Sequence, residues 1–156
     1  MFERFVGQIF IESMPPHLGQ VILQRTGALG FRHRPDGTVG RWGAIRPDIE
    51  LRRGSQVLSV LDTKYKKTSE GSLKNPDFYQ VLSYCEAESS NLGGLIYPRS
   101  EYASDDEIRI RNSPIRMHRF AINLAVPSAD LIAEAERLVM RVADWVRREE
   151  RLAESA

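Results

Sequence analysis

Three acidic side chains and one lysine stand among the Ile, Leu and Val residues of one stretch of the chain, residues 46–64. The Ile, Leu and Val residues of this stretch favour two strands, and a glycine and a serine between them supply the turn of a β-hairpin. Because strand side chains alternate between faces, Asp48 and Glu50 share one face of the first strand. Asp62 and Lys64 share one face of the second strand. Burying carboxylates without partners is costly, so this pattern implies a compensating charge, most simply a metal ion.

The register of this hairpin decides whether its two aspartates can share one ion. With a tight two-residue turn at Arg53-Gly54, Asp48 would face Ser59. That register leaves Asp62 three residues further along, roughly 10 Å away at strand rise. We therefore predict a longer loop or a bulge around Arg53 to Gln56 that brings Asp48 opposite Asp62.

Length and composition are those of one globular domain. The 156 residues are 42% hydrophobic and 28% charged, which suffices for a single core. We expect one domain over residues 1–156, with its core in residues 1–98 and extra strands and a C-terminal helix in residues 105–150. The sequence has no apolar run of about 18 residues and no secretory N-terminal segment, which predicts a cytoplasmic protein with no membrane partner.

Cysteine and histidine do not indicate a zinc or iron–sulfur site. The single cysteine, Cys85, cannot form an internal disulfide or a multi-cysteine metal site, and we expect it to be a small buried residue on a helix. The three histidines have no metal-type spacing and are interpreted as structural or surface residues. They are His17, His33 and His118.

Charge is distributed unevenly along the chain. Residues 20–75 hold eleven Lys and Arg against five Asp and Glu, a sum of +6, whereas residues 1–19 sum to −1 and residues 76–156 to −4. A positive surface beside an acidic pocket suits an enzyme that handles a polyanion; an ordinary charged sheet is the alternative. The candidate phosphate contacts, which could equally be solubilising charges, are Arg32, Arg34, Arg41, Lys66 and Lys67.

Periodicity predicts the elements before the hairpin. A helix runs from Phe2 to about Met14, with apolar residues at helical spacing and Pro15-Pro16 ending it. A strand is expected at Gln20 to Thr26. A Gly-rich, basic segment follows from Gly27 to Gly43, with a turn signal at Asp36-Gly37.

Glu3 lies beside the apolar stripe of the first helix. Glu3 either stabilises the helix N-terminus electrostatically or has a role near the metal ion, and the sequence leaves both interpretations open. Because a core-facing residue already stands at position 2, we expect the chain to be a fragment or a shortened relative of a longer protein.

A polar loop, Lys66 to Lys74, follows the hairpin and leads into a second helix. Asn75-Pro76 is a typical cap and first-turn pair, so this helix should run from there to about Ser89. Gln80 and Tyr84 are four residues apart and therefore share one face of it. The residues able to face the core are Phe78, Val81, Leu82 and Cys85.

The sequence after the second predicted helix indicates three strands and a long helix. The strands are expected at Leu92 to Tyr97, Glu107 to Arg111 and Met117 to Val126, and the helix begins near Ser128. We expect its apolar stripe to pack on the protein's own sheet rather than on a partner. The stripe consists of Leu131, Ala135, Leu138, Val142 and Trp145.

The order helix, strand, acidic hairpin, helix, strand resembles the PD-(D/E)XK nuclease core, an α/β restriction-endonuclease-like fold with a mixed central β-sheet flanked by helices. Pro47-Asp48 looks like the first acidic motif of that superfamily, and Asp62-Thr63-Lys64 looks like the second. Gln80 and Tyr84 together resemble the additional helix motif of the RecB-like branch.

The finer pattern over about residues 1–98 is similar to the nuclease domain of McrC, the cleavage subunit of the McrBC modified-cytosine restriction system. McrC proteins carry an N-terminal region that contacts a GTP-driven motor subunit (McrB), for which this chain has no room, so recruitment by that partner is left open. The iron–sulfur cysteines of some RecB-like nucleases are absent. The motifs are Phe2-Glu3-x-Phe5-Val6, Asp62-Thr63-Lys64-Tyr65-Lys66, Phe78-Tyr79-Gln80-Val81-Leu82-Ser83-Tyr84 and Gly94-Leu95-Ile96-Tyr97-Pro98.

The resemblance implies a DNA endonuclease that depends on Mg²⁺, with Mn²⁺ as a substitute. Asp48 and Asp62 would supply carboxylates to the ion, and the backbone carbonyl of Thr63 would supply a further ligand. Glu3 and Glu50 are secondary candidates for metal ligands.

The remaining motif residues would act around the reacting phosphate. Lys64 would orient the attacking water or stabilise developing charge, unless it is only a structural ion-pair partner of Asp62 or Glu50. Gln80 and Tyr84 would position Lys64, the water or a phosphate, unless they are only an exposed helix-favouring pair.

Two other interpretations remain open from the sequence. The chain can be a nuclease-fold remnant that binds nucleic acid or a partner without cutting, or a RecB-like exonuclease or a nuclease acting on RNA. Since nucleases of this class often need two copies to cut two strands, a homodimer is also plausible.

Overall fold

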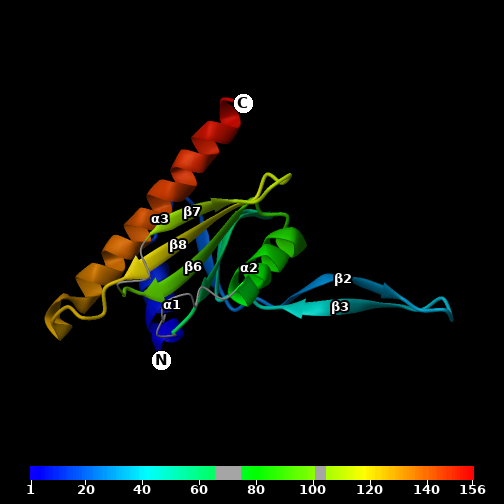
Figure 1. Cartoon of the computed structure of the whole chain (residues 1–156), viewed down its shortest axis with the longest axis horizontal. Helices are drawn as coiled ribbons and strands as arrows, with labels where there is room; N and C mark the ends of the chain where they lie inside the picture. The colour runs from blue at the N-terminus through cyan, green and yellow to red at the C-terminus, as the bar shows by residue number, and fades with distance from the viewer. Residues whose placement is uncertain (66–74, 101–104) are drawn as a thin grey trace.

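The computed structural model describes residues 1–65, 75–100 and 105–156, which form a sheet flanked by helices and a separate two-stranded hairpin (Figure 1). In chain order the described elements are α1 (Phe2–Ser13), β1 (Gln20–Leu23), β2 (Gly27–His33), β3 (Val39–Ile45), β4 (Ile49–Arg53), β5 (Gln56–Thr63), α2 (Asn75–Glu88), β6 (Leu92–Pro98), β7 (Asp106–Arg109), β8 (Arg116–Ile122), the 3₁₀ turn η1 (Ser128–Asp130) and α3 (Leu131–Glu154).

Six strands form one mixed sheet in the order β1-β4-β5-β6-β8-β7. The pairs β1–β4, β4–β5 and β7–β8 are antiparallel, whereas β5–β6 and β6–β8 are parallel. The parallel step from β5 to β6 requires a crossover, and α2 provides it. The α/β fold with a mixed central sheet that the sequence predicted is confirmed.

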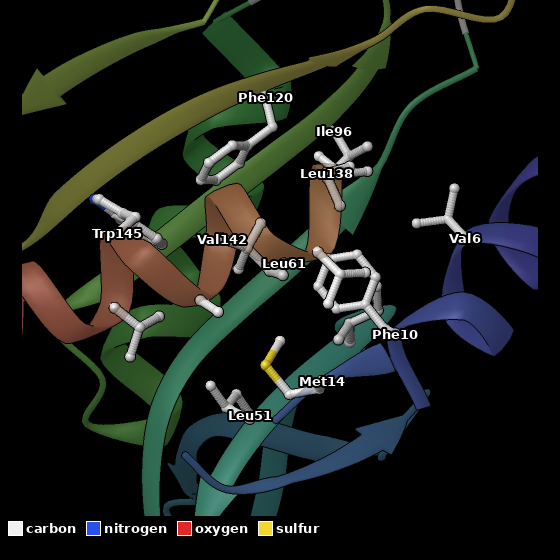
Figure 2. Packing of buried hydrophobic residues seen from close by; sticks show 14 of the residues in the cluster. Val6, Phe10, Met14, Leu51, Leu61, Ile96, Phe120, Leu138, Val142 and Trp145 are labelled. Atoms are coloured by element: carbon white, nitrogen blue, oxygen red, sulfur yellow. The ribbon is translucent and has the colours of Figure 1, made fainter. Parts of the chain in front are cut away.

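One face of the sheet is covered by α1 and α3, which also contact each other. Figure 2 shows their apolar side chains meeting strand residues between the helices and the sheet. Phe10 of α1, Leu61 of β5 and Leu138 of α3 are all almost completely buried there. The apolar stripe of α3 therefore packs on the protein's own sheet, as the sequence predicted.

The other face of the sheet is covered by α2. Val81 and Cys85 of α2 are buried against β5, β6 and β8, at the positions that the sequence assigned to the core. The closest approach is at Gly93 of β6, where an added Cβ would lie 2.7 Å from Val81 and 2.8 Å from the Cys85 sulfur. Only a residue without a side chain fits between this helix and this strand.

Strands β2 and β3 form a hairpin that is separate from the main sheet and projects from the body of the molecule (Figure 1). The turn predicted at Asp36-Gly37 is present: Gly37 has a φ of 85°, and the Asp36 carboxylate accepts hydrogen bonds from the backbone and side chain of Thr38. The two strands on either side of this turn were not predicted, because their sequence alternates glycine with charged and aromatic residues instead of presenting an apolar face.

Several strands are shorter than the sequence predicted. β1 ends at Leu23 rather than Thr26, because Gln24 adopts a left-handed conformation with φ 50°. β7 ends at Arg109 rather than Arg111. β8 ends at Ile122 rather than Val126, because the Asn123 side chain accepts a hydrogen bond from the Ala125 backbone and forms a local turn. The last helix starts with the 3₁₀ turn η1 and becomes α-helical at Leu131.

The hairpin of β4 and β5 contains the predicted irregularity at a different position. Its turn is tight, with Arg53 paired to Gln56, so the longer loop expected around Arg53 to Gln56 is absent. The register instead shifts between Leu51 and Arg52, inside the strands. The turn lies at Gly54-Ser55 rather than Arg53-Gly54, which shifts the register by two residues, and the bulge adds a third, so that Ile49 lies opposite Leu61.

Candidate active site

Asp48 and Asp62 meet at the end of the β4–β5 hairpin that is remote from its turn. One step beyond the pair Ile49–Leu61, the register places Asp48 opposite Asp62. Asp48 is also held from the side, since its Oδ2 accepts hydrogen bonds from the backbone nitrogen and from the hydroxyl of Thr63, both at 2.7 Å. The Asp48 carboxylate is therefore fixed against the last residue of β5.

Asp62 is a buried carboxylate with a strongly shifted pKa. Burial raises the pKa of Asp62 to about 6, the hydrogen bond and charge of Lys64 oppose this rise, and the negative charge of Asp48 adds to it. Lys64 forms an ion pair with Asp62 Oδ2. Two carboxylates and one ammonium group thus share a confined site in which negative charge is costly.

Lys64 connects the acidic pair to α2. Its Nζ donates a hydrogen bond to Gln80 Oε1 at 2.7 Å. Burial lowers the pKa of the Lys64 ammonium, but the hydrogen bond and charge of Asp62, together with the charges of Asp77 and Asp48, raise it by more. The net pKa lies above its ordinary value, so Lys64 is a fixed positive charge rather than a base.

Gln80 and Tyr84 continue the same chain of contacts along one face of α2. Gln80 Nε2 donates a hydrogen bond to the Tyr84 hydroxyl oxygen at 2.7 Å. Burial, with the negative charge of Asp62 adding, raises the pKa of Tyr84, which keeps its hydroxyl protonated and able to donate. The structure therefore brings Gln80 and Tyr84 to Lys64.

Glu3, whose role the sequence left open, lies beside Asp48. Burial raises the pKa of Glu3, and the charge of Asp48 and a hydrogen bond with it raise this pKa further. Gln24, directly after β1, donates a hydrogen bond to Glu3 and accepts one from Arg46. The first helix therefore places a carboxylate beside Asp48.

Two residues near this site, Asp77 and Tyr97, were not predicted from the sequence as site residues. The Asp77 side chain is buried, and its charge raises the pKa of both Lys64 and Asp62. Tyr97 of β6 donates a hydrogen bond to Asp77 at 3.2 Å. Helical spacing offered a signal, since Asp77 stands three residues before Gln80 and therefore on its face of α2.

Glu50 lies in a different environment. Its side chain is completely buried, its Oε2 is 3.2 Å from Arg52, and its pKa is raised by burial and by the charge of Glu88. Within the described part of the chain, the hydrogen bonds and ion pair of Asp48 and Asp62 do not involve Glu50.

The predicted phosphate contacts are divided between two regions. Arg32, Arg34 and Arg41 are exposed on the β2–β3 hairpin. Lys66 and Lys67, with the loop Lys66 to Lys74, lie outside the described residues.

An open cavity of about 650 Å³ adjoins the acidic site. Glu3 and Thr63 contribute to its wall, and Tyr65 lies at its edge with its ring 5.4 Å from that of Phe2. The remaining lining residues are Met1, Phe5, Leu124 and Leu131. The cavity thus opens to solvent beside the acidic site and has mostly apolar walls.

The donor set suits a hard divalent cation that keeps part of its water. In the described ranges, no three His, Cys, Asp or Glu side chains converge to form a complete ligand cage. Mg²⁺ needs no such cage, because it is usually held by one or two carboxylates, waters and substrate phosphate oxygens. Asp48 and Asp62 are the carboxylates that could hold such a cation, and its positive charge would offset the repulsion between them.

The fold and the site define an α/β protein whose mixed sheet presents a carboxylate–lysine cluster at the ends of two strands. The model of the McrBC 5-methylcytosine restriction system component family matches residues 1–98. The chain therefore belongs to this family, as the sequence predicted.

A likeness to a solved structure agrees with this assignment. A chain in the half-complex from a tetradecameric assembly of Thermococcus gammatolerans McrB AAA+ hexamers with bound McrC superposes with a TM-score of 0.62 at 16% sequence identity. The match covers 90% of this chain and 32% of that chain, so this chain spans about a third of its length. At this identity the likeness shows the fold alone. No curated protein matched.

None of the helices in the described ranges is both long enough and apolar enough to span a membrane.

Proposed function

We propose that the chain is an Mg²⁺-dependent DNA endonuclease of the PD-(D/E)XK type, acting as the McrC-like component of a restriction system. The observation that carries this proposal is the continuous chain of contacts from Asp62 through Lys64 and Gln80 to Tyr84, with Asp48 beside it. A structural ion pair does not need a part-buried amide and a buried phenol behind it.

The residues divide the work of phosphodiester hydrolysis between them. Asp48 and Asp62, with the Thr63 carbonyl, would hold Mg²⁺ or Mn²⁺, which polarises the phosphate and lowers the pKa of bound water. Lys64, kept positive by its acidic neighbours, stabilises the negative charge that develops on the phosphate. Gln80 fixes the direction of the ammonium group, and Tyr84 fixes Gln80.

Cleavage assays on plasmid and linear DNA with Mg²⁺ test the proposal. Wild-type protein is expected to nick or linearise plasmid, and Asp62→Ala to lose this activity, because one of the two carboxylates that hold the ion is removed. Asp144→Ala is the matched control, since Asp144 is an exposed acid on α3 that forms an ion pair with Arg147.

Each outcome of this assay selects one interpretation. Equal behaviour of wild-type protein and Asp62→Ala would contradict the nuclease assignment and favour a module that binds without cutting. A requirement for free DNA ends would indicate an exonuclease, and a preference for RNA would redefine the substrate.

A motor subunit is the proposed partner. The similar solved chain comes from a complex of McrB AAA+ hexamers with bound McrC, which supports the same kind of assembly here. If a gene adjacent to this one encodes a GTP-binding motor, its product should co-elute with this chain and accelerate cleavage when GTP is present. Cleavage at an unchanged rate with and without that motor and GTP would contradict the partnership.

A further inference from the structure

The β2–β3 hairpin carries side chains that the proposed site does not use. Figure 1 shows it as an arm that extends away from the sheet and helices. Its strands pair only with each other among the described strands, and each has seven residues, which corresponds to a length of about 20 Å. We call residues 27–45 the arm.

Each face of the arm presents an aromatic ring beside arginine. Phe31 pairs with Arg41 on one face, and Trp42 pairs with Gly30 on the other. The exposed fractions of Phe31 and Trp42 are 68% and 57%. At Gly30 no atom lies within 4 Å of an added Cβ, so the space across from Trp42 is open. Such exposed apolar groups, far from any core, indicate a binding surface.

The charge of the arm indicates what it binds. Arg32, Arg34 and Arg41 form no ion pair with any residue in the described ranges. The single acid of the arm, Asp36, is engaged at the tip by two hydrogen bonds from Thr38, which lower its pKa. Unpaired guanidinium groups combined with open aromatic faces fit a polyanion built from flat rings, which is a nucleic acid.

We propose that the arm grips duplex DNA beside the active site, an inference that rests on the proposed nuclease function. Ile45, the last residue of β3, is 3% exposed and stands three residues before Asp48, so the base of the arm is fixed in the core next to the acidic site. A two-stranded ribbon fits the major groove, and its length of about 20 Å corresponds to about six base-pair steps. The arginines bind phosphates, while Phe31 and Trp42 contact base edges, such as the thymine methyl group, and sugars.

Fluorescence anisotropy with a fluorescein-labelled DNA duplex, in EDTA and over a salt series, tests this proposal without requiring cleavage. Arg32→Gln and Arg41→Gln should each lower the magnitude of the slope of log K against log salt by about 0.9, because one phosphate contact is lost. Phe31→Ala and Trp42→Ala should weaken binding by about tenfold at every salt concentration and leave the slope unchanged, because an apolar contact with base edges is lost but no phosphate contact.

Arg151→Gln and Leu152→Ala serve as matched controls. Both residues are exposed near the end of α3, away from the arm in Figure 1, so their loss should change neither affinity nor slope. Because all the substituted side chains are exposed, the melting temperatures should stay at the wild-type value, which separates lost contacts from lost fold.

Unchanged affinity and slope in all four arm variants would overturn the proposal, whether or not their oligomeric state changes. A change in self-association alone would assign the arm to a second copy of the chain. Failure of the nuclease proposal has a different signature: wild-type protein would bind the duplex in EDTA through the arm but leave it uncut in Mg²⁺.

Discussion

At the scale of single residues, Asp62 is the side chain whose chemistry the fold changes most clearly. Its carboxyl lies between the negative charge of Asp48 and the positive charge of Lys64, in a position that excludes most water. Its pKa of about 6, against an ordinary value of 3.8, means that the metal-free protein holds a proton there under mildly acidic conditions.

This raised pKa predicts how stability depends on pH. Between pH 3.8 and about 6 the native Asp62 binds more protons than the unfolded one, so its contribution to stability falls as the pH rises through this window. Lowering the pH from about 6 to about 4 should therefore stabilise the metal-free wild-type protein by about 2 kcal/mol relative to Asp62→Asn. Urea unfolding of both proteins in EDTA measures this difference. A difference that does not change with pH would contradict the assigned pKa.

Gln80 is expected to act by positioning Lys64. In Gln80→Ala the ammonium group loses the acceptor that holds it at 2.7 Å, so single-turnover cleavage should slow by about 10- to 100-fold. DNA affinity in EDTA should stay near the wild-type value, which separates positioning from binding. Tyr84→Phe removes only the hydroxyl behind Gln80 and should have a smaller effect. Equal cleavage rates for Gln80→Ala and wild-type protein would contradict this role.

At the scale of elements, the close approach of β6 to its neighbours determines where the site residues lie. β6 stands between β5, which carries Asp62, and β8. Gly94 of β6 lies so close to neighbouring side chains that an added Cβ would be 2.3 Å from Leu61 Cδ2 and 3.3 Å from Phe120 Cε2. Both neighbours are fully buried and have little space into which to move.

Gly94→Ala is therefore expected to destabilise the protein by about 1–3 kcal/mol, because the added methyl group overpacks the core between β5 and β8. The matched control is Gly30→Ala on the arm, where an added Cβ meets no atom within 4 Å and the change in stability should be within about 0.5 kcal/mol. Urea unfolding of both variants provides the measurement. Equal stabilities of the two variants would show that the core can accommodate the methyl group.

The predicted elements were accurate where local signals are strong. The extents of α1 and α2 follow from apolar spacing and from the pair Asn75-Pro76, which act within one or two helical turns. The strands of the arm were missed, because their pairing depends on backbone hydrogen bonds and on a turn, not on an apolar face. The bulge was predicted from the need to align Asp48 with Asp62, but its position between Leu51 and Arg52 was not.

At the scale of the whole molecule, α3 joins the C-terminal part of the chain to the first helix and the central sheet. It packs on β8 and on α1, and Trp145 of α3 is buried against His118 and Phe120. The first and last helices thus share one core, which requires both ends of the described chain to fold together.

This shared core predicts one cooperative unfolding transition. In a Trp42→Phe protein the buried Trp145 is the sole tryptophan and reports the docking of α3, whereas far-UV circular dichroism reports all helices and strands. The two signals should give the same urea midpoint. An earlier transition for Trp145 fluorescence would show that α3 detaches before the rest of the sheet unfolds.

The sequence by itself determined the helices, the acidic hairpin, the family resemblance and the types of the candidate site residues, because spacing, caps and alternation act over a few residues. Only the tertiary structure decided that Glu3 lies beside Asp48, that Asp77 acts on Lys64, that Glu50 is fully buried and paired with Arg52, and that the arm extends from the body. These features depend on how α1 and α2 pack on opposite faces of one sheet. That packing is set by the burial of apolar surface between segments far apart in the chain, which no local pattern specifies.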